Sequence, residues 1–252
     1  MWLSSFLLAL CLGSLGWSLR RDVADYRTFK LLTKTSERQK RYRKWVLKSF
    51  LLFSCTPVAA LAILGRLGGL VELPREFRPL FGALNAHAPA ASTLSPSLVG
   101  SFLGALAAGL IAGVLMPRLL RRRAKPIQVG DIAALLPRNG AETAWTALLS
   151  VNAGVGEELY FRLLLPLLLV SVCGNALAAF VIAGLIFGAV HFYQGVAGIL
   201  ATTIIGGALA ALYLWTGNLW VAAAAHALLD LVGLVIRPTI QRLVARSTAV
   251  RA

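Results

Sequence analysis

The chain has 252 residues, of which 58% are hydrophobic and only 14% are charged, and its mean hydropathy is +0.75. This composition excludes an ordinary soluble domain and is typical of an integral membrane protein. The net charge of +15 could suggest nucleic-acid binding, but the basic residues cluster in short segments between apolar stretches. That pattern indicates membrane topology and contact with anionic lipids, so we expect no nucleic-acid partner.

The first 140 residues predict three membrane helices. The apolar stretches are residues 2–19, 45–64 and 98–116, each close to the roughly 20 residues that cross a bilayer core. The first lacks the basic start and the cleavage site of a secretory signal, so we expect an uncleaved helix. Lys48 lies just inside the second helix and is expected to extend to the interface. Residues 1–140 are thus predicted to be membrane helices joined by basic cytoplasmic loops.

From about residue 141 the chain is almost continuously apolar, and turn signals divide it into four more helices. These are predicted at about residues 141–170, 175–193, 196–215 and 218–236, followed by a basic cytoplasmic tail over 237–252. Seven helices with an external N-terminus place every basic stretch on one side of the membrane, as the positive-inside rule requires. The sequence therefore predicts an all-α polytopic bundle of about seven helices. Its expected location is a bacterial inner membrane, with the C-terminus in the cytoplasm.

Six ionisable side chains lie inside the predicted helices of the C-terminal half. They are Glu157, Glu158, Arg162, His191, His226 and Asp230. An ionisable group at membrane depth costs at least a few kcal/mol, so by default it marks a functional site. We therefore place the active site within the last four helices, in a core spanning residues 141–236.

Spacing sorts these side chains onto helix faces. Glu158 and Arg162 are four residues apart and can pair, which leaves Glu157, about 100° round the helix, free to meet another partner. His226 and Asp230 are also four apart, and Phe187 lies one turn before His191. Three helices thus present a Glu, a His and a His–Asp pair to one interior point.

Such a set suits hydrolysis by activated water. A carboxylate can act as a general base, a neighbouring His can share the water or protonate the leaving amine, and further donors can hold an oxyanion. Glu157, His191, His226 and Asp230 could instead ligate a divalent metal such as zinc. The sequence contains no His-Glu-x-x-His helix and no Gly-x-Ser-x-Gly elbow, so a serine mechanism has no evident nucleophile.

Three motifs fall in order on successive predicted helices. They are Gly156-Glu157-Glu158-Leu159-Tyr160-Phe161-Arg162, then Phe187-Gly188-Ala189-Val190-His191, then His226-Ala227-Leu228-Leu229-Asp230. This series resembles the Glu-Glu-x-x-x-Arg, Phe-x-x-x-His and His-x-x-x-Asn (or Asp) pattern of the CPBP family. That family is the CAAX prenyl endopeptidase and bacteriocin-processing group, also called the ABI family. The likeness covers about residues 141–236, whereas the N-terminal 140 residues carry no mark of the family.

The resemblance implies an intramembrane endopeptidase, of glutamate or metal type, that cleaves a membrane-tethered peptide or protein in a CAAX-processing reaction. By that likeness Glu157 and His191 would activate water, and His226 with residue 230 would stabilise the oxyanion. Glu158 and Arg162 would support them, with Phe187 packed beside the site. Position 230 departs from the commoner Asn, and an ionised Asp cannot donate a hydrogen bond. Asp230 must therefore be protonated, orient His226 or ligate a cation.

Two other function classes accommodate buried Glu, His and Asp residues. A non-catalytic immunity or scaffold relative would keep the fold, but it has no chemical need for Glu157 and His191 together. A cation or proton transporter would use them as a relay, yet its polar or broken helices usually occur in both halves of the chain. The substrate stays open among a prenylated protein, a peptide pheromone, a bacteriocin leader and a sorting-signal tail.

One geometric difficulty follows from simple topology. Glu157 falls near the middle of its predicted helix, whereas His191 falls near the cytoplasmic end of the next one. We therefore expect a break or tilt near Gly154-Val155-Gly156 to bring the two side chains level.

Overall fold

The computed structural model describes residues 2–86, 100–102, 104, 105, 107–109, 111, 112 and 129–249. Every regular element among these residues is helical, and four of the helices are long and apolar enough to cross a membrane. They span Trp2–Lys30, Thr35–Ile63, Phe192–Thr216 and Leu219–Leu243. The predicted all-α polytopic bundle is therefore confirmed.

The N-terminal part is an antiparallel hairpin of two long helices. Helix α1 spans Trp2–Lys30, and α2 (Thr35–Ser49) continues through the π-helical turn η1 (Phe50–Cys55) into α3 (Thr56–Ile63). The sequence predicted shorter helices at 2–19 and 45–64, joined by a basic loop. In the structure both helices extend into that basic segment. The reason is local: residues 20–44 contain no Gly or Pro, and their charges pair across the hairpin. Only residues 31–34 form the turn.

The connection that follows contains three short elements, η2 (Leu67–Leu70), η3 (Arg75–Phe77) and α4 (Arg78–Asn85). The helix predicted at 98–116 and most of the second basic segment lie outside the described residues, apart from short helical pieces between 100 and 112. The description resumes at residue 129 with a loop that contains η4 (Ala133–Leu135).

The C-terminal half forms the helices that the sequence predicts, with ends shifted by a few residues except in the last helix, which continues beyond its predicted end. Helix α6 (Gly140–Glu158) runs through η5 (Leu159–Leu164) into α7 (Leu165–Cys173), and α8 spans Ala176–Val190. After η6 (Phe192–Gln194) comes α9 (Gly195–Thr216). The last long helix joins α10 (Leu219–Asp230), η7 (Leu231–Ile236) and α11 (Arg237–Ala249), so residues 237–249 of the predicted tail are helical.

The turns between these helices follow from two Gly-Asn pairs. Gly174 and Gly217 adopt φ values of 66° and 64°, the left-handed conformation that ends a helix at low cost only for glycine. The side chains of Asn175 and Asn218 then accept backbone hydrogen bonds from Ala178 and Trp220 and cap the next helices.

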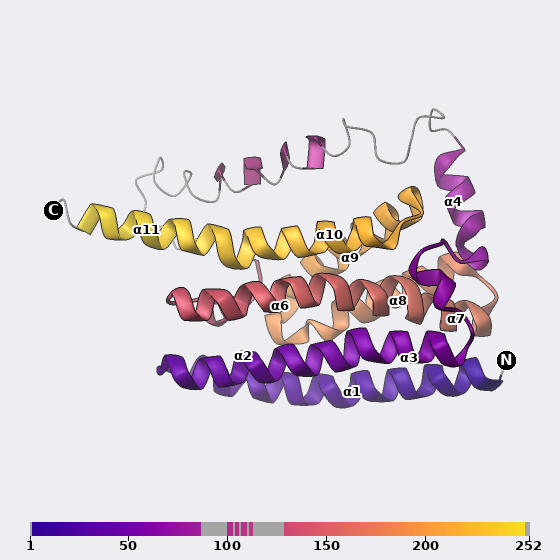
Figure 1. Ribbon diagram of the computed structural model, residues 1–252, viewed down its shortest axis with the longest axis horizontal. Coiled ribbons are helices and arrows are strands. Elements are labelled where there is room, and N and C mark those ends of the chain that lie inside the picture. The colour runs from indigo at the N-terminus through magenta and orange to yellow at the C-terminus, as the bar shows by residue number, and fades with distance from the viewer. Residues whose placement is uncertain are drawn as a thin grey trace.

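In Figure 1 helix α6 lies between the α1–α2 hairpin and the α10–α11 helix. The approach of α6 to α10 is very close, because a Cβ on Gly154 would lie 2.5 Å from the backbone nitrogen of Ala227. Gly156 packs in the same way against Phe53 and Ser54 of η1. These glycines therefore set the position of the two glutamates that follow them.

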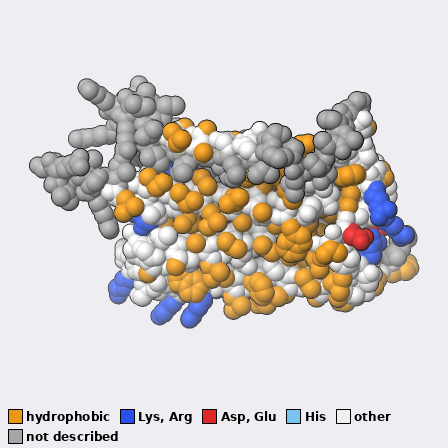
Figure 2. Space-filling model, turned by 45° about the horizontal axis from the view of Figure 1, so that its top comes forward, with side chains coloured by type: hydrophobic (Ala, Val, Ile, Leu, Met, Phe, Trp, Pro, Cys, Tyr) orange, Lys and Arg blue, Asp and Glu red, His pale blue; other side chains and the backbone are white. Residues whose placement is uncertain are grey.

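Outer side chains match a lipid environment. Leu185, Leu200 and Ile204 are 59%, 60% and 72% exposed, which water would disfavour and lipid would not. On the face shown in Figure 2, hydrophobic side chains spread across the middle, while Lys and Arg gather near its ends. We call the end that carries residues 31–34, 129–139 and 191–194 the basic end of the bundle.

Candidate active site

The carboxylate of Glu158 is the centre of the polar cluster. Its Oε1 lies 2.8 Å from Nη1 of Arg162 and 2.7 Å from Nδ1 of His226. The first contact is the pair that their spacing predicts. The second joins α6 to α10, and nothing in the spacing indicated it. Because the Glu158 and Arg162 side chains are only 0% and 2% exposed, these contacts lie in a water-poor interior.

Arg162 ties the cluster to two further helices. Its Nη2 donates a hydrogen bond to the carbonyl oxygen of Gly206 in α9 at 3.1 Å. Its guanidinium carbon lies 4.3 Å from the ring centroid of Phe187 in α8, a cation–π geometry. Phe187 therefore does more than fill space: it covers a buried cation on one face of the cluster.

His226 has two differently placed nitrogens. Because the Glu158 carboxylate accepts, Nδ1 donates to it, which fixes the ring orientation. On the other side, Nε2 lies 3.9 Å from Oε2 of Glu157 and 4.0 Å from Oδ2 of Asp230. These separations are longer than hydrogen bonds. Nε2 therefore faces the two carboxylates across a gap.

His191 stands at the C-terminal end of α8. Its Nδ1 lies 2.8 Å from the carbonyl oxygen of Phe187, which can only accept, so Nδ1 carries a hydrogen. In the neutral ring Nε2 is then the lone-pair nitrogen. The Phe187 ring also contacts both histidines, with centroids 4.8 Å from His191 and 6.1 Å from His226.

One cavity of about 390 Å³ brings the predicted reactive groups together. Glu157, His191, His226 and Asp230 all line it, with Phe187, whereas Glu158 and Arg162 lie behind its wall. Helix α6 is unbroken through Gly154–Gly156, so the expected break is wrong. Glu157 and His191 nevertheless line the same cavity, and the Phe187 ring contacts both His191 and His226.

Glu157 differs from its neighbour in having no strong partner. Its Oε2 is buried and makes no hydrogen bond to any described residue, and the side chain is 14% exposed, toward the cavity. A buried carboxylate oxygen without a partner is rare in a folded interior, so it marks Glu157 as a group that function, not stability, keeps unpaired. Within the described ranges, no three His, Cys, Asp or Glu side chains are grouped as metal ligands.

The N-terminal hairpin supplies a wall of this cavity, which sequence reasoning missed. Leu15 and Leu19 of α1 and Trp45 of α2 line it, as does Phe53 of η1. Lys48 also lines it instead of extending only toward the interface. The one available signal was an ionisable residue just inside an apolar stretch, and that signal does not tell which way the side chain points.

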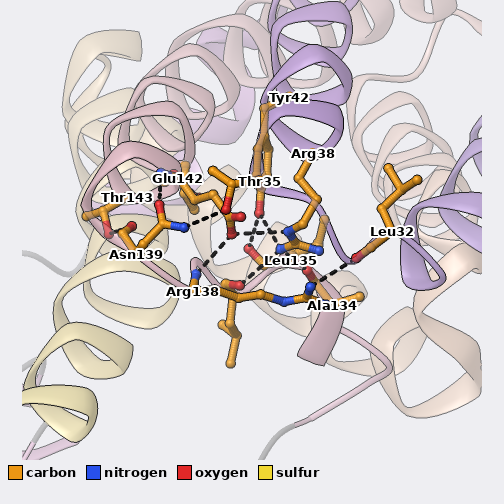
Figure 3. A network of polar contacts seen from close by, with 12 residues as sticks. Leu32, Thr35, Arg38, Tyr42, Ala134, Leu135, Arg138, Asn139, Glu142 and Thr143 are labelled. Carbon is orange, nitrogen blue, oxygen red and sulfur yellow. Dashed lines mark hydrogen bonds and ion pairs between the residues drawn. The ribbon is translucent and has the colours of Figure 1, made fainter. Parts of the chain in front are cut away.

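A second buried ion pair fixes the loop at the basic end of the cavity (Figure 3). Nε of Arg38 in α2 lies 3.1 Å from Oε2 of Glu142 in α6, and both side chains are 0% exposed. Arg38 Nη2 also donates to the carbonyl oxygens of Ala134 and Leu136, at 2.9 and 3.3 Å. The hydroxyl of Tyr42 donates to the Leu135 carbonyl at 3.0 Å.

We call residues 129–139 the end loop. Three of its side chains line the cavity, those of Val129, Ile132 and Leu135. Its Asp131 backbone nitrogen donates to the carbonyl oxygen of Gln194, and its Asp131 carboxylate pairs with Lys30 of α1. The end loop is thus held against α1, α2 and the α8–α9 turn, and it bounds the cavity at the basic end.

Residues 139–232 match the family described as type II CAAX prenyl endopeptidase Rce1-like. Neither curated proteins nor solved structures gave a match. The matched segment begins at the N-cap of α6 and ends in η7, so it contains all three motifs and every predicted site residue. The family resemblance seen in the sequence is therefore confirmed for this segment.

Proposed function

We propose that this chain, which carries an Rce1-like, type II CAAX prenyl endopeptidase segment over residues 139–232, is an intramembrane endopeptidase that uses Glu157 as its general base. The observation that carries this assignment is the free, buried Oε2 of Glu157 in a cavity that it shares with His191 and His226. Glu158 is committed to Arg162 and His226, so it is the orienting carboxylate of the pair.

Hydrolysis then proceeds from a water held between Glu157 and His191. The carboxylate of Glu157 takes a proton as the water oxygen bonds to the carbonyl carbon of the substrate. The C–N bond of the tetrahedral intermediate breaks, and the leaving nitrogen receives that proton, delivered by Glu157 or through Nε2 of His191. The products are a carboxylic acid and an amine, and no other reactant is consumed.

In this proposal His226 donates to the oxyanion. Nδ1–H of His226 points at Glu158, so Nε2 can donate a hydrogen bond only when the ring is a positively charged imidazolium. The buried Glu158 carboxylate stabilises that charge through its charge-assisted hydrogen bond with Nδ1. Asp230, 4.0 Å from Nε2, acts as the second carboxylate that orients this ring. Arg162 and Phe187 keep the Glu158 carboxylate in place.

The membrane setting follows from the same arrangement. Residues 141–236 form the catalytic core, residues 1–140 provide the hairpin wall and basic loops, and 237–252 form a basic tail. The basic end faces the cytoplasm, where its Lys and Arg contact anionic headgroups, because positive residues stay on that side of an inner membrane. The substrate is a membrane-associated peptide or protein that reaches the cavity along the bilayer.

The test uses purified protein in lipid vesicles with a lipid-anchored peptide substrate. Glu157→Gln keeps the shape of the side chain and removes its basicity, so we expect cleavage to fall about 100-fold or more. Glu37→Gln, at an exposed position on α2, is the matched control and should cleave like the parent.

Parallel assays with a chelator separate the two catalytic types. Cleavage that is lost in Glu157→Gln but unchanged by chelator supports the glutamate mechanism. Loss in chelator that added zinc reverses would assign ligand roles to the His and carboxylate groups instead. Unchanged cleavage by Glu157→Gln contradicts the proposal and favours a non-catalytic relative or a transporter.

A further inference from the structure

The cavity contains a second polar group, on the side opposite the motifs. The ammonium of Lys48 in α2 pairs with the carboxylate of Asp22 in α1, whose Oδ2 also accepts a hydrogen bond from the Ser18 hydroxyl at 3.0 Å. All three side chains line the cavity. The Lys48 and Asp22 side chains keep 25% and 32% exposure, so the pair is open to an incoming group.

The charges around the cavity make Lys48 distinctive. Among the described residues that line it, Lys48 is the one Lys or Arg, whereas Asp22, Glu157 and Asp230 are acids. These carboxylates repel a negatively charged ligand group. The Lys48 ammonium attracts it, as does the His226 imidazolium of the proposed mechanism, and of these two cations only Lys48 lies outside the motifs. An ammonium has three donors, and the described contacts of Lys48 use one Asp22 oxygen.

The distance from Lys48 to the reacting level can be estimated from helix geometry. Phe53 and Ser54 pack directly against Gly156, the residue before Glu157. Lys48 lies five and six residues earlier on the same continuous helix, which is about 7–9 Å along its axis. An extended peptide advances about 3.3–3.6 Å per residue, so two or three residues cover this separation.

We propose that Lys48 binds the free C-terminal carboxylate of the substrate, with Asp22 and Ser18 positioning its ammonium. The assignment rests on the proposed peptidase function. It makes Lys48 a specificity residue, supplied by the N-terminal hairpin outside the segment that matches the family. A chain end seated on Lys48 places the bond two or three residues upstream beside Glu157.

The experiment compares two lipid-anchored peptides that differ only in ending as a carboxylate or a carboxamide. The parent protein should prefer the acid in kcat/KM by about tenfold or more, the worth of a charge-assisted hydrogen bond. Lys48→Met should bring the acid-to-amide ratio close to one, with the change in KM for the acid. Lys48→Arg retains a cation and should keep most of the preference.

Lys44→Met is the matched control. Lys44 lies one turn before Lys48, pairs with Asp25 and is absent from the cavity lining, so its loss should leave the ratio at the parental value. An equal rate on acid and amide by the parent, or a preference that survives Lys48→Met, overturns the assignment. Absence of any cleavage by the parent is a different result, which counts against the peptidase function itself.

A second measurement needs no variant. Tripeptides ending in a carboxylate or a carboxamide are tested as competitive inhibitors of the parent enzyme. The acid should inhibit at a concentration about tenfold or more below that of the amide. Equal inhibition by both contradicts a role for Lys48 even where Lys48→Met fails to fold.

Discussion

Oε1 of Glu158 and Nδ1 of His226 lie 2.7 Å apart although the residues are separated by 68 positions in the chain. This contact joins the first and third motifs. The two adjacent glutamates therefore have different surroundings. The Glu158 carboxylate is bound by Arg162 and His226, whereas Glu157 lines the cavity.

Removing the Glu158 charge should damage both folding and cleavage. Glu158→Gln leaves the Arg162 guanidinium buried without its carboxylate, and breaking a buried pair costs about 3–5 kcal/mol. We expect a clearly lower Tm in detergent, together with at least a tenfold loss of cleavage from the misplaced His226 ring.

A double variant separates these two effects. Glu158→Leu combined with Arg162→Met removes both charges, which is often neutral for stability. Its Tm should recover relative to Glu158→Gln while cleavage stays low. Recovery of cleavage would show that Glu158 does not orient His226.

The close approach of α6 to α10 gives a second prediction. Gly154→Ala places a methyl group 2.5–2.6 Å from backbone and Cβ atoms of Ala227, so the helices must separate. The expected cost is about 1–3 kcal/mol, with reduced cleavage because Glu157 and Glu158 shift relative to His226.

Gly184→Ala is the control for this substitution. A Cβ at Gly184 meets nothing within 4 Å, and the residue lies inside α8. Since Ala is the better helix former by about 1 kcal/mol, the variant should be at least as stable as the parent and equally active. If Gly154→Ala is as stable and active as Gly184→Ala, the tight contact between Gly154 and Ala227 is refuted.

Asp230 can be tested by a conservative exchange. Asp230→Asn keeps the shape and adds an N–H donor, so cleavage should be retained or increased if the side chain only orients groups at the oxyanion. Asp230→Ala removes the contact with His226 and should reduce cleavage several-fold. If Asp230→Asn loses as much activity as Asp230→Ala, catalysis depends on the negative charge of Asp230. Steady-state kcat and KM for both variants decide between these outcomes.

The buried Arg38–Glu142 pair should have a strong effect on stability. Arg38→Met leaves the fully buried Glu142 carboxylate without its cation and should cost about 3–5 kcal/mol. Arg41→Met is the comparison, because Arg41 is 23% exposed in its pair with Asp25 and should matter by about 1 kcal/mol or less. Thermal unfolding measures both. Equal Tm values for the two variants would contradict a structural role for the buried pair.

Much of this architecture is readable from the sequence. Apolar length located the C-terminal helices, the Gly174-Asn175 and Gly217-Asn218 turns divided them, and a four-residue spacing predicted the Glu158–Arg162 pair. These signals are local, because they depend on one helix or one turn at a time.

The contacts that build the site are between helices, and spacing does not report them. The Glu158–His226 contact and the hairpin wall around Lys48 depend on how helices cross. For the same reason an apolar count missed the helical extensions into residues 20–44, whose charges are neutralised by partners on the opposite helix. A buried position for Arg38 is equally invisible without its partner Glu142.

The π-helical turns next to the motifs have a consequence for sequence change. A π turn closes its hydrogen bonds over five residues instead of four, so it holds one residue more than the α-helix around it. One such turn, η5, follows Glu158 and another, η7, follows Asp230. Deleting one residue after Arg162 in η5, or one residue of η7, can restore plain α-helical winding there without changing the rotational phase of the helix beyond it. These two places therefore tolerate a change in chain length that would elsewhere turn every later side chain by about 100°.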